Sequence, residues 1–128
     1  MASSTQMPDT RTPEFRTTCD AFHRGRFYLV QPAEGAHRSG IDATLLAASV
    51  PDGFAGKLAD LGSGAGAAAL SVLDRCGEAS AVLYEKMPPM AHCARQTLAL
   101  PQNAHLQPRA EVRDADVALD GKAREFAD

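Results

Sequence analysis

The sequence predicts an α/β fold built on a parallel sheet, and three observations support this prediction. Strand-like and helix-like segments alternate between Lys57 and Arg113, which is the order typical of parallel sheets. A turn with three glycines at alternate positions, Gly62 to Gly66, follows the first of these strands. Acidic residues stand at or just after the ends of the strands. Because right-handed crossovers bring the carboxyl ends of parallel strands to one edge, we expect the turn and the acids to lie together there.

A strand and a helix are expected before the sheet. Residues 1–18 are polar and contain many Ser and Thr, so we predict a mobile arm there and a folded domain over residues 19–128. Phe27 to Gln31 is rich in aromatic and branched residues and stops at a proline, which indicates a strand. After a loop, Asp42 is expected to cap a helix over Ala43 to Ser49.

The sheet itself is predicted to contain three strands joined by two helices. The strands are expected over Lys57 to Leu61, Ala79 to Tyr84 and Arg109 to Arg113, of which the last has the weakest pattern. The first helix should run from Ala65 to Arg75. The second should run from Pro88 to Ala99, since the first turn of a helix tolerates proline, which has no N–H.

Composition excludes several classes of protein. The chain has 128 residues, enough for one domain or part of one, and its net charge of −3 gives no general attraction to a polyanion. No apolar run approaches the roughly 18 residues of a membrane span, and no signal peptide is visible. The cysteines are odd in number and widely spaced, so reduced thiols and a cytoplasmic location are expected. The four histidines lack ligand spacing, so no metal site is predicted.

The glycine turn indicates a nucleotide-like cofactor, but the glycines alone leave two cofactors open. Gly62, Gly64 and Ala67 also satisfy the dinucleotide pattern G-x-G-x-x-G/A. Asp60 favours S-adenosylmethionine, because a carboxylate beside the turn would repel a pyrophosphate and can hold the cationic amino-acid end of S-adenosylmethionine. Glu85 ends the second strand, where a carboxylate can accept hydrogen bonds from both ribose hydroxyls.

A third acid completes this pattern. Asp114 and Asp116 follow the third predicted strand, near the expected position of the adenine ring, and either could accept a hydrogen bond from its amino group. Taken singly, each strand-end acid could instead be a solvated cap for the next helix. The combination with the glycine turn favours the cofactor site.

These residues resemble those of a known family. Asp60 to Gly66 resembles the first motif of class I S-adenosylmethionine-dependent methyltransferases. Upstream, Asp20 to Phe27, Gln31-Pro32 and Arg38 to Ala48 resemble the lead-in of the small-domain subgroup, which is similar to tRNA adenine-N6 methyltransferases acting on valine tRNA. The likeness extends from Asp20 to Val117 and implies the N-terminal half of a Rossmann-like parallel sheet.

The resemblance implies a role for each candidate cofactor-binding residue. The glycines of the turn would line the cofactor, with Asp60 near its methionine end. Glu85 would bind the ribose hydroxyls, and Asp116 (or Asp114) the adenine amino group. The loop and helix start before the sheet would close over the tail of the cofactor. The residues implied are Arg38, Gly40, Asp42, Asp60, Gly62, Gly64, Gly66, Glu85 and Asp116.

One motif of the subgroup is absent from these 128 residues. In the subgroup, the fourth strand ends in Asn-Pro-Pro and an aromatic residue, which grips the amino group to be methylated. Phe126-Ala127-Asp128 resembles only the start of that strand, so no catalytic residue is identified. We expect either a fragment of a longer protein or a second chain that covers the exposed apolar edge of the glycine-bearing strand. Such an edge would also permit self-association.

The predicted function is S-adenosylmethionine-dependent methyl transfer. The resemblance implies an exocyclic amino nitrogen of a base in RNA, adenine N6 of tRNA, as the acceptor. A protein glutamine or an rRNA guanine is an alternative acceptor, since these relatives share the Asn-Pro-Pro motif. A non-catalytic module that binds S-adenosylmethionine, or a partner, without turnover is the alternative from a different class.

Overall fold

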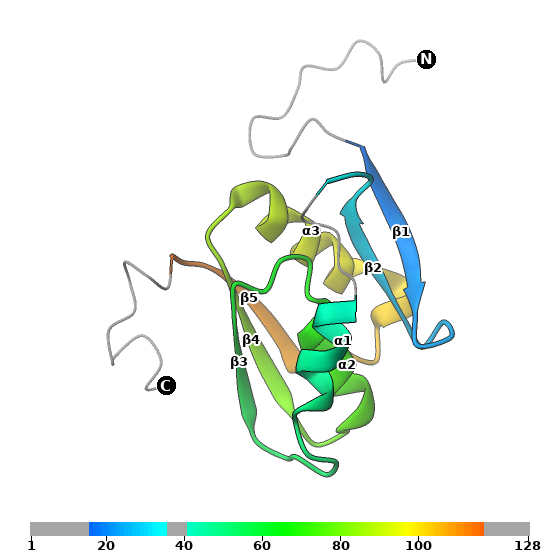
Figure 1. Cartoon of the computed structure of the whole chain (residues 1–128), viewed down its shortest axis with the longest axis vertical. Coiled ribbons are helices and arrows are strands. Elements are labelled where there is room, and N and C mark those ends of the chain that lie inside the picture. The colour runs from blue at the N-terminus through cyan, green and yellow to red at the C-terminus, as the bar shows by residue number, and fades with distance from the viewer. Residues whose placement is uncertain (1–15, 36–40, 117–128) are drawn as a thin grey trace.

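The computed structural model describes residues 16–35 and 41–116 (Figure 1). The elements, in chain order, are β1 (Thr17–Phe22), β2 (Phe27–Pro32), α1 (Ile41–Ala48), β3 (Lys57–Leu61), α2 (Ala67–Arg75), β4 (Ser80–Glu85), α3 (Pro88–Ala99), the short 3-10 helices η2 (Pro101–Asn103) and η3 (Gln107–Arg109), and β5 (Ala110–Asp114).

The strands β3, β4 and β5 form a parallel sheet in that spatial order. The register places Asp60 beside Leu83 and Glu85 beside Asp114, so the acidic strand ends meet at one edge. The three α-helices lie on one side of this sheet (Figure 1). Two of them, α2 and α3, connect its strands, and right-handed crossovers that progress in one direction place both on the same side. The predicted α/β fold with a parallel, Rossmann-like sheet is therefore confirmed.

The core lies between the sheet and its helices. Leu70, Val72 and Leu73 of α2 are almost completely buried, as the apolar spacing of this helix predicts. They join a cluster that includes Leu83 of β4 and Leu29 of β2. Burying a side chain of this size contributes about 1.5–3 kcal/mol, so the cluster fixes α2, and with it the turn that precedes it, against the sheet.

A two-stranded antiparallel hairpin, β1 and β2, lies on the other side of the helices from the sheet (Figure 1). Strand β2 matches the predicted strand, but β1 was not predicted. It begins at Thr17, so two residues assigned to the N-terminal arm belong to the hairpin. Its side chains alternate between exposed and half-buried, and this polar pattern gives little apolar signal for a strand.

Side chains from α3 and η2 fasten the hairpin to the rest of the fold. The Thr97 hydroxyl accepts a hydrogen bond from the Val30 N–H at 2.9 Å. The Asn103 amide accepts from the Tyr28 N–H at 2.9 Å and donates to the Tyr28 carbonyl at 2.7 Å. These two buried side chains satisfy backbone groups of β2 that β1 does not reach.

Helix α1 begins at Ile41, two residues earlier than predicted, so Asp42 lies within its first turn rather than at the N-cap. A carboxylate there still interacts favourably with the helix dipole. The helix exposes large apolar side chains, with Ile41 at 72%, Leu45 at 63% and Leu46 at 61% exposure. Within the described part of the chain, no helix is both long enough and apolar enough to span a membrane.

Candidate cofactor site

The glycine turn between β3 and α2 forms the rim of the candidate site. Gly62, Gly64 and Gly66 have φ values of 75°, 58° and 106°, which other residues adopt only with strain. The Gly62 and Ser63 N–H groups both donate to the Tyr84 carbonyl, at 2.8 and 3.0 Å. The alternating glycines therefore let the turn fold back onto the end of β4.

The backbone N–H groups of this turn are mostly engaged within the protein. Besides Gly62 and Ser63, Gly64 donates to the Glu85 Oε1 at 2.8 Å and Gly66 donates to the Ser63 carbonyl at 3.1 Å. A dinucleotide site needs such groups for the pyrophosphate oxygens. The turn thus disfavours a dinucleotide because few of its N–H groups are free to bind phosphate oxygens. The glycine pattern in the sequence could not show this.

The three glycines have different surroundings. A Cβ atom at Gly62 would meet nothing within 4 Å, and one at Gly64 would lie 3.8 Å from the Met90 Cε. A Cβ atom at Gly66 would lie only 2.9 Å from the Leu83 Cδ2. Gly62 and Gly64 therefore keep the rim open, whereas Gly66 is required for packing against β4.

Asp60 is a buried acid whose carboxylate has an incomplete set of hydrogen bonds. The residue is only 8% exposed, and its Oδ2 has no hydrogen-bond partner among the described residues. Burial raises the pKa of the Asp60 carboxyl, a backbone hydrogen bond from Ala69 opposes this, and the nearby Glu85 carboxylate raises the pKa further. A buried acceptor without a partner costs free energy, so this oxygen is suited to a cationic or donor group of a ligand.

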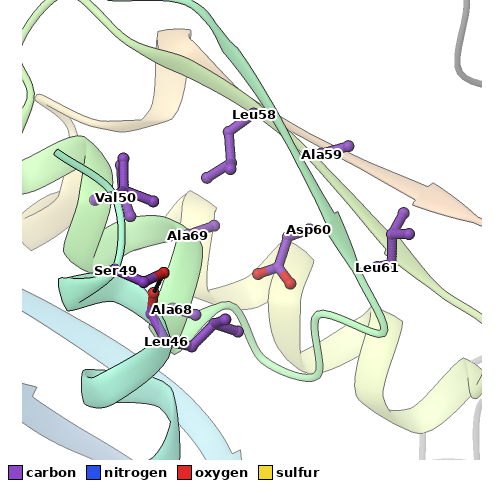
Figure 2. Close-up of a pocket in the computed structure, with 10 residues that line it drawn as sticks. Leu46, Ser49, Val50, Leu58, Ala59, Asp60, Leu61, Ala68 and Ala69 are labelled. Carbon is purple, nitrogen blue, oxygen red and sulfur yellow. Dashed lines mark hydrogen bonds between the residues drawn. The ribbon is translucent and has the colours of Figure 1, made fainter. Parts of the chain in front are cut away.

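A cavity of about 340 Å³ opens beside Asp60. Figure 2 shows the Asp60 carboxylate and Leu58 directed from β3 toward the helices, whereas Ala59 and Leu61 point away. Among the described residues that line the cavity, Asp60 alone is charged. The lining residues are Leu46, Ser49, Val50, Leu58, Ala59, Asp60, Leu61, Ala68, Ala69 and Val72. Sequence reasoning missed the contribution of α1, because the segment offers no signal for which helix face meets the sheet edge.

Glu85 joins two loops at the carboxyl edge of the sheet. Its Oε1 accepts from the Gly64 N–H at 2.8 Å, and its Oε2 accepts from the Met87 N–H at 3.0 Å. The residue is 7% exposed. The structure thus brings Glu85 against the glycine turn, as the sequence predicts for a cofactor-binding acid, and adds two backbone partners that the sequence did not reveal.

The two acids of the third strand have different positions. Asp114 ends β5 and accepts hydrogen bonds from Arg95 of α3, the shorter at 2.8 Å. This guanidinium lowers the pKa of the Asp114 carboxyl. Asp116 lies two residues beyond the strand and is half-buried. Asp114 is thus engaged with α3, and the assignment of an adenine contact to Asp116 (or Asp114) stays a prediction.

The remaining candidates lie outside this cluster. Arg38 and Gly40 fall outside the described residues, and Asp42 is exposed on the first turn of α1. Within residues 16–35 and 41–116, no group of three or more His, Cys, Asp or Glu side chains could hold a metal ion.

Comparison with known proteins places the chain in a family. The sequence model of the family described as "Methyltransferase small domain" matches residues 36–127. A solved structure from Agrobacterium tumefaciens, described as a predicted O-methyltransferase, Atu636, is 49% identical over 66% of this chain and 41% of its own, with a TM-score of 0.58. No curated protein matches the sequence.

More distant structures share the fold. The TYW2 protein of M. jannaschii, solved in complex with AdoMet, is 11% identical over 83% of this chain and 46% of its own, with a TM-score of 0.62. A SAM-dependent O-methyltransferase from Thermotoga maritima is 20% identical over 67% and 32%, with a TM-score of 0.53. The chain spans less than half the length of each of these proteins. From its sequence match and this fold, the chain belongs to the methyltransferase small domain family.

Proposed function

We propose that the carboxyl edge of the sheet binds S-adenosylmethionine and that the chain serves methyl transfer from it. The observation that carries this proposal is the buried Asp60 Oδ2, which has no hydrogen-bond partner within residues 16–35 and 41–116. It lies beside a glycine turn whose N–H groups are mostly engaged. A cationic ammonium suits that oxygen, and the turn offers little to a pyrophosphate. Membership of the methyltransferase small domain family supports the same cofactor.

The residues of the site fit the parts of this cofactor. Asp60 would accept a hydrogen bond from the ammonium of the methionine end, and the open rim at Gly62 would admit the ligand. Glu85 would accept from the ribose hydroxyls, and Asp116 from the adenine amino group. Arg38, Gly40 and Asp42 remain predicted contacts to the cofactor tail.

When bound, S-adenosylmethionine supplies an electrophilic methyl group on a sulfonium sulfur. The described residues bind and orient it, which is the main contribution expected where an acceptor attacks directly. Leu46, Leu58 and Ala68 supply apolar walls to the cavity beside Asp60. No described residue is assigned a proton-transfer role.

We propose an exocyclic amino nitrogen of an RNA base, adenine N6 of tRNA, as the methyl acceptor. This proposal is supported by the likeness of the Asp20–Phe27 and Arg38–Ala48 segments to the small-domain subgroup. An adenine within a stacked RNA helix would have to leave the stack to reach such a site. A protein glutamine or an rRNA guanine would present a similar amino group.

An oxygen acceptor is the second candidate. The relative from Agrobacterium tumefaciens, 49% identical over the matched region, is described as a predicted O-methyltransferase. That description favours a hydroxyl group as the acceptor.

A binding measurement tests the cofactor. Calorimetry of the protein with S-adenosylmethionine should show one site per chain, and NADH should not compete. Asp60→Ala should weaken binding by about ten-fold or more, the effect of losing a charged hydrogen bond. Glu78→Ala, at an exposed acid outside the site, is the matched control. Equal affinity of the Asp60→Ala and wild-type proteins would overturn the assignment.

A transfer assay separates the acceptors. The protein would be incubated with methyl-labelled S-adenosylmethionine and either unmodified tRNA or small phenols. Label in N6-methyladenosine supports the RNA acceptor, and label on a phenolic oxygen supports the second candidate. Binding without transfer to any acceptor would indicate a non-catalytic module.

We also propose that the isolated chain self-associates through the outer edge of β3. No described strand pairs with that edge, and Leu61 at its end is 52% exposed. Leu45 and Leu46 of α1 add exposed apolar surface. Unpaired strand edges of this kind are templates for pairing with another chain.

A further inference from the structure

We propose that Glu85 is a positioning residue for the glycine turn, in addition to its role as a ribose ligand. It holds the turn in its binding shape before the cofactor arrives. This inference rests on the proposed function for its ligand, but the geometry that carries it belongs to the ligand-free protein.

The hydrogen bonds of Glu85 connect two loops that are distant in sequence. Oε1 accepts from Gly64 in the turn after β3, and Oε2 accepts from Met87 at the N-cap of α3. Each carboxylate oxygen therefore holds one backbone N–H, at 2.8 and 3.0 Å respectively. With 7% exposure, the carboxylate is held where solvent competes little for these bonds.

Within the turn, Gly64 depends most on its hydrogen bond to the Glu85 carboxylate. The N–H groups of Gly62 and Ser63 are held by the backbone carbonyl of Tyr84, whereas the N–H of Gly64 is held by a side chain. Glycine loses more conformational freedom on ordering than any other residue. A glycine at φ 58° without its hydrogen bond would thus sample other shapes, and the cofactor would have to order it on binding.

Positioning and ribose binding are compatible in one carboxylate. Each ionised oxygen offers two lone-pair directions. Glu85 can therefore keep its bonds to Gly64 and Met87 while it accepts from the two ribose hydroxyls. A glutamine of the same shape cannot do this, since its amide nitrogen does not accept and would face one of the two N–H groups.

Hydrogen exchange in the ligand-free protein tests the positioning role directly. Glu85→Gln should speed exchange of the Gly64 N–H, the Met87 N–H or both by about ten-fold, the factor for roughly 1.4 kcal/mol. The Cys76 N–H, which donates to the Val72 carbonyl at the far end of α2, is the internal reference and should not change. Glu78→Gln, at an exposed turn, is the matched control. Unchanged exchange at both Gly64 and Met87 in a folded Glu85→Gln protein would overturn the proposal.

A ligand without ribose hydroxyls separates the two roles. Adenosine and 2′,3′-dideoxyadenosine would be titrated into the wild-type and Glu85→Gln proteins. If Glu85 also positions the turn, the variant should bind the dideoxy ligand about three- to ten-fold more weakly than the wild type does. Equal dideoxy affinity, with a loss confined to adenosine, would leave Glu85 as a ribose ligand alone and overturn the inference. A wild-type protein that binds neither S-adenosylmethionine nor adenosine would instead refute the proposed function, while the exchange result would stand.

Discussion

Among single side chains, Asp60 combines burial with an incomplete set of hydrogen bonds. The Ala69 N–H donates to the carboxylate, but no described residue donates to the Asp60 Oδ2. Asp60→Asn keeps an oxygen for the Ala69 N–H and removes a negative charge that burial and the nearby Glu85 disfavour. It should therefore stabilise the ligand-free protein at neutral pH. The same change should weaken S-adenosylmethionine binding. Urea unfolding and calorimetry on one preparation check both; a variant that loses both stability and affinity would contradict the expectation.

The raised pKa of Asp60 also gives a direction for the pH dependence of stability. As pH rises above the ordinary Asp pKa of 3.8, the unfolded chain ionises at Asp60 before the folded protein does. The contribution of Asp60 should therefore lower the free energy of unfolding as pH rises from 3.8 to the higher pKa that Asp60 has in the folded protein. Above that pKa the destabilisation should stay constant. Comparing urea midpoints of the wild type and Asp60→Asn from pH 4 to 8 isolates this contribution; parallel pH profiles would contradict it.

The three glycines of the turn, equivalent in the sequence, should respond differently to alanine. Gly66→Ala places a Cβ 2.9 Å from the Leu83 Cδ2 at φ 106°, so a loss of about 1–3 kcal/mol in stability is expected. Gly62→Ala meets open space and adds only the strain of positive φ, about 1–2 kcal/mol. Because Gly62 lies on the open rim of the site, Gly62→Ala should weaken cofactor binding in addition to this loss of stability. Thermal unfolding and calorimetry distinguish the two; equal losses of stability would contradict the packing role of Gly66.

Among the secondary-structure elements, those with strong local signals could be predicted. Helix α3 occupies Pro88–Ala99, the predicted range, because prolines mark its start and an apolar pattern fills it. Strand β1 could not be predicted, since its stability comes from pairing with β2 rather than from its own apolar pattern. The side chains that hold β2 lie 67 and 75 residues away along the chain, at Thr97 and Asn103.

The attachment of the hairpin gives a test of this long-range contact. Thr97→Val keeps the shape of the buried side chain but removes the acceptor for the Val30 N–H. A loss of about 1–3 kcal/mol in the free energy of unfolding is expected, the cost of a buried donor without a partner. Thr44→Val, at an exposed position of α1, is the matched control. Urea unfolding measures the loss, and an effect no larger than that of Thr44→Val would contradict the role of this hydrogen bond.

For the chain as a whole, sequence reasoning identified the cofactor edge better than the identity of the acceptor. The glycine turn and Glu85 are local patterns, and parallel topology brings them together. The engagement of the turn's N–H groups and the unpartnered Asp60 Oδ2 depend on coordinates and could not be read from the chain. The acceptor stays a proposal, because the matched region spans only 41% of the Agrobacterium relative.

The exposed edge of β3 supports a last prediction, on the assembly of the isolated chain. Leu61, at 52% exposure, ends a strand whose outer edge pairs with no described strand. The 128-residue chain should therefore show concentration-dependent self-association in sedimentation velocity. Leu61→Lys should reduce it, because a charge on an edge strand opposes pairing.

Ala104→Lys, at an exposed position between η2 and η3, adds the same charge away from β3 and should leave association unchanged. This control separates a specific effect at the β3 edge from a general effect of net charge. Equal reduction by the two lysines would point to general repulsion, and a chain that stays monomeric at every concentration would contradict edge pairing.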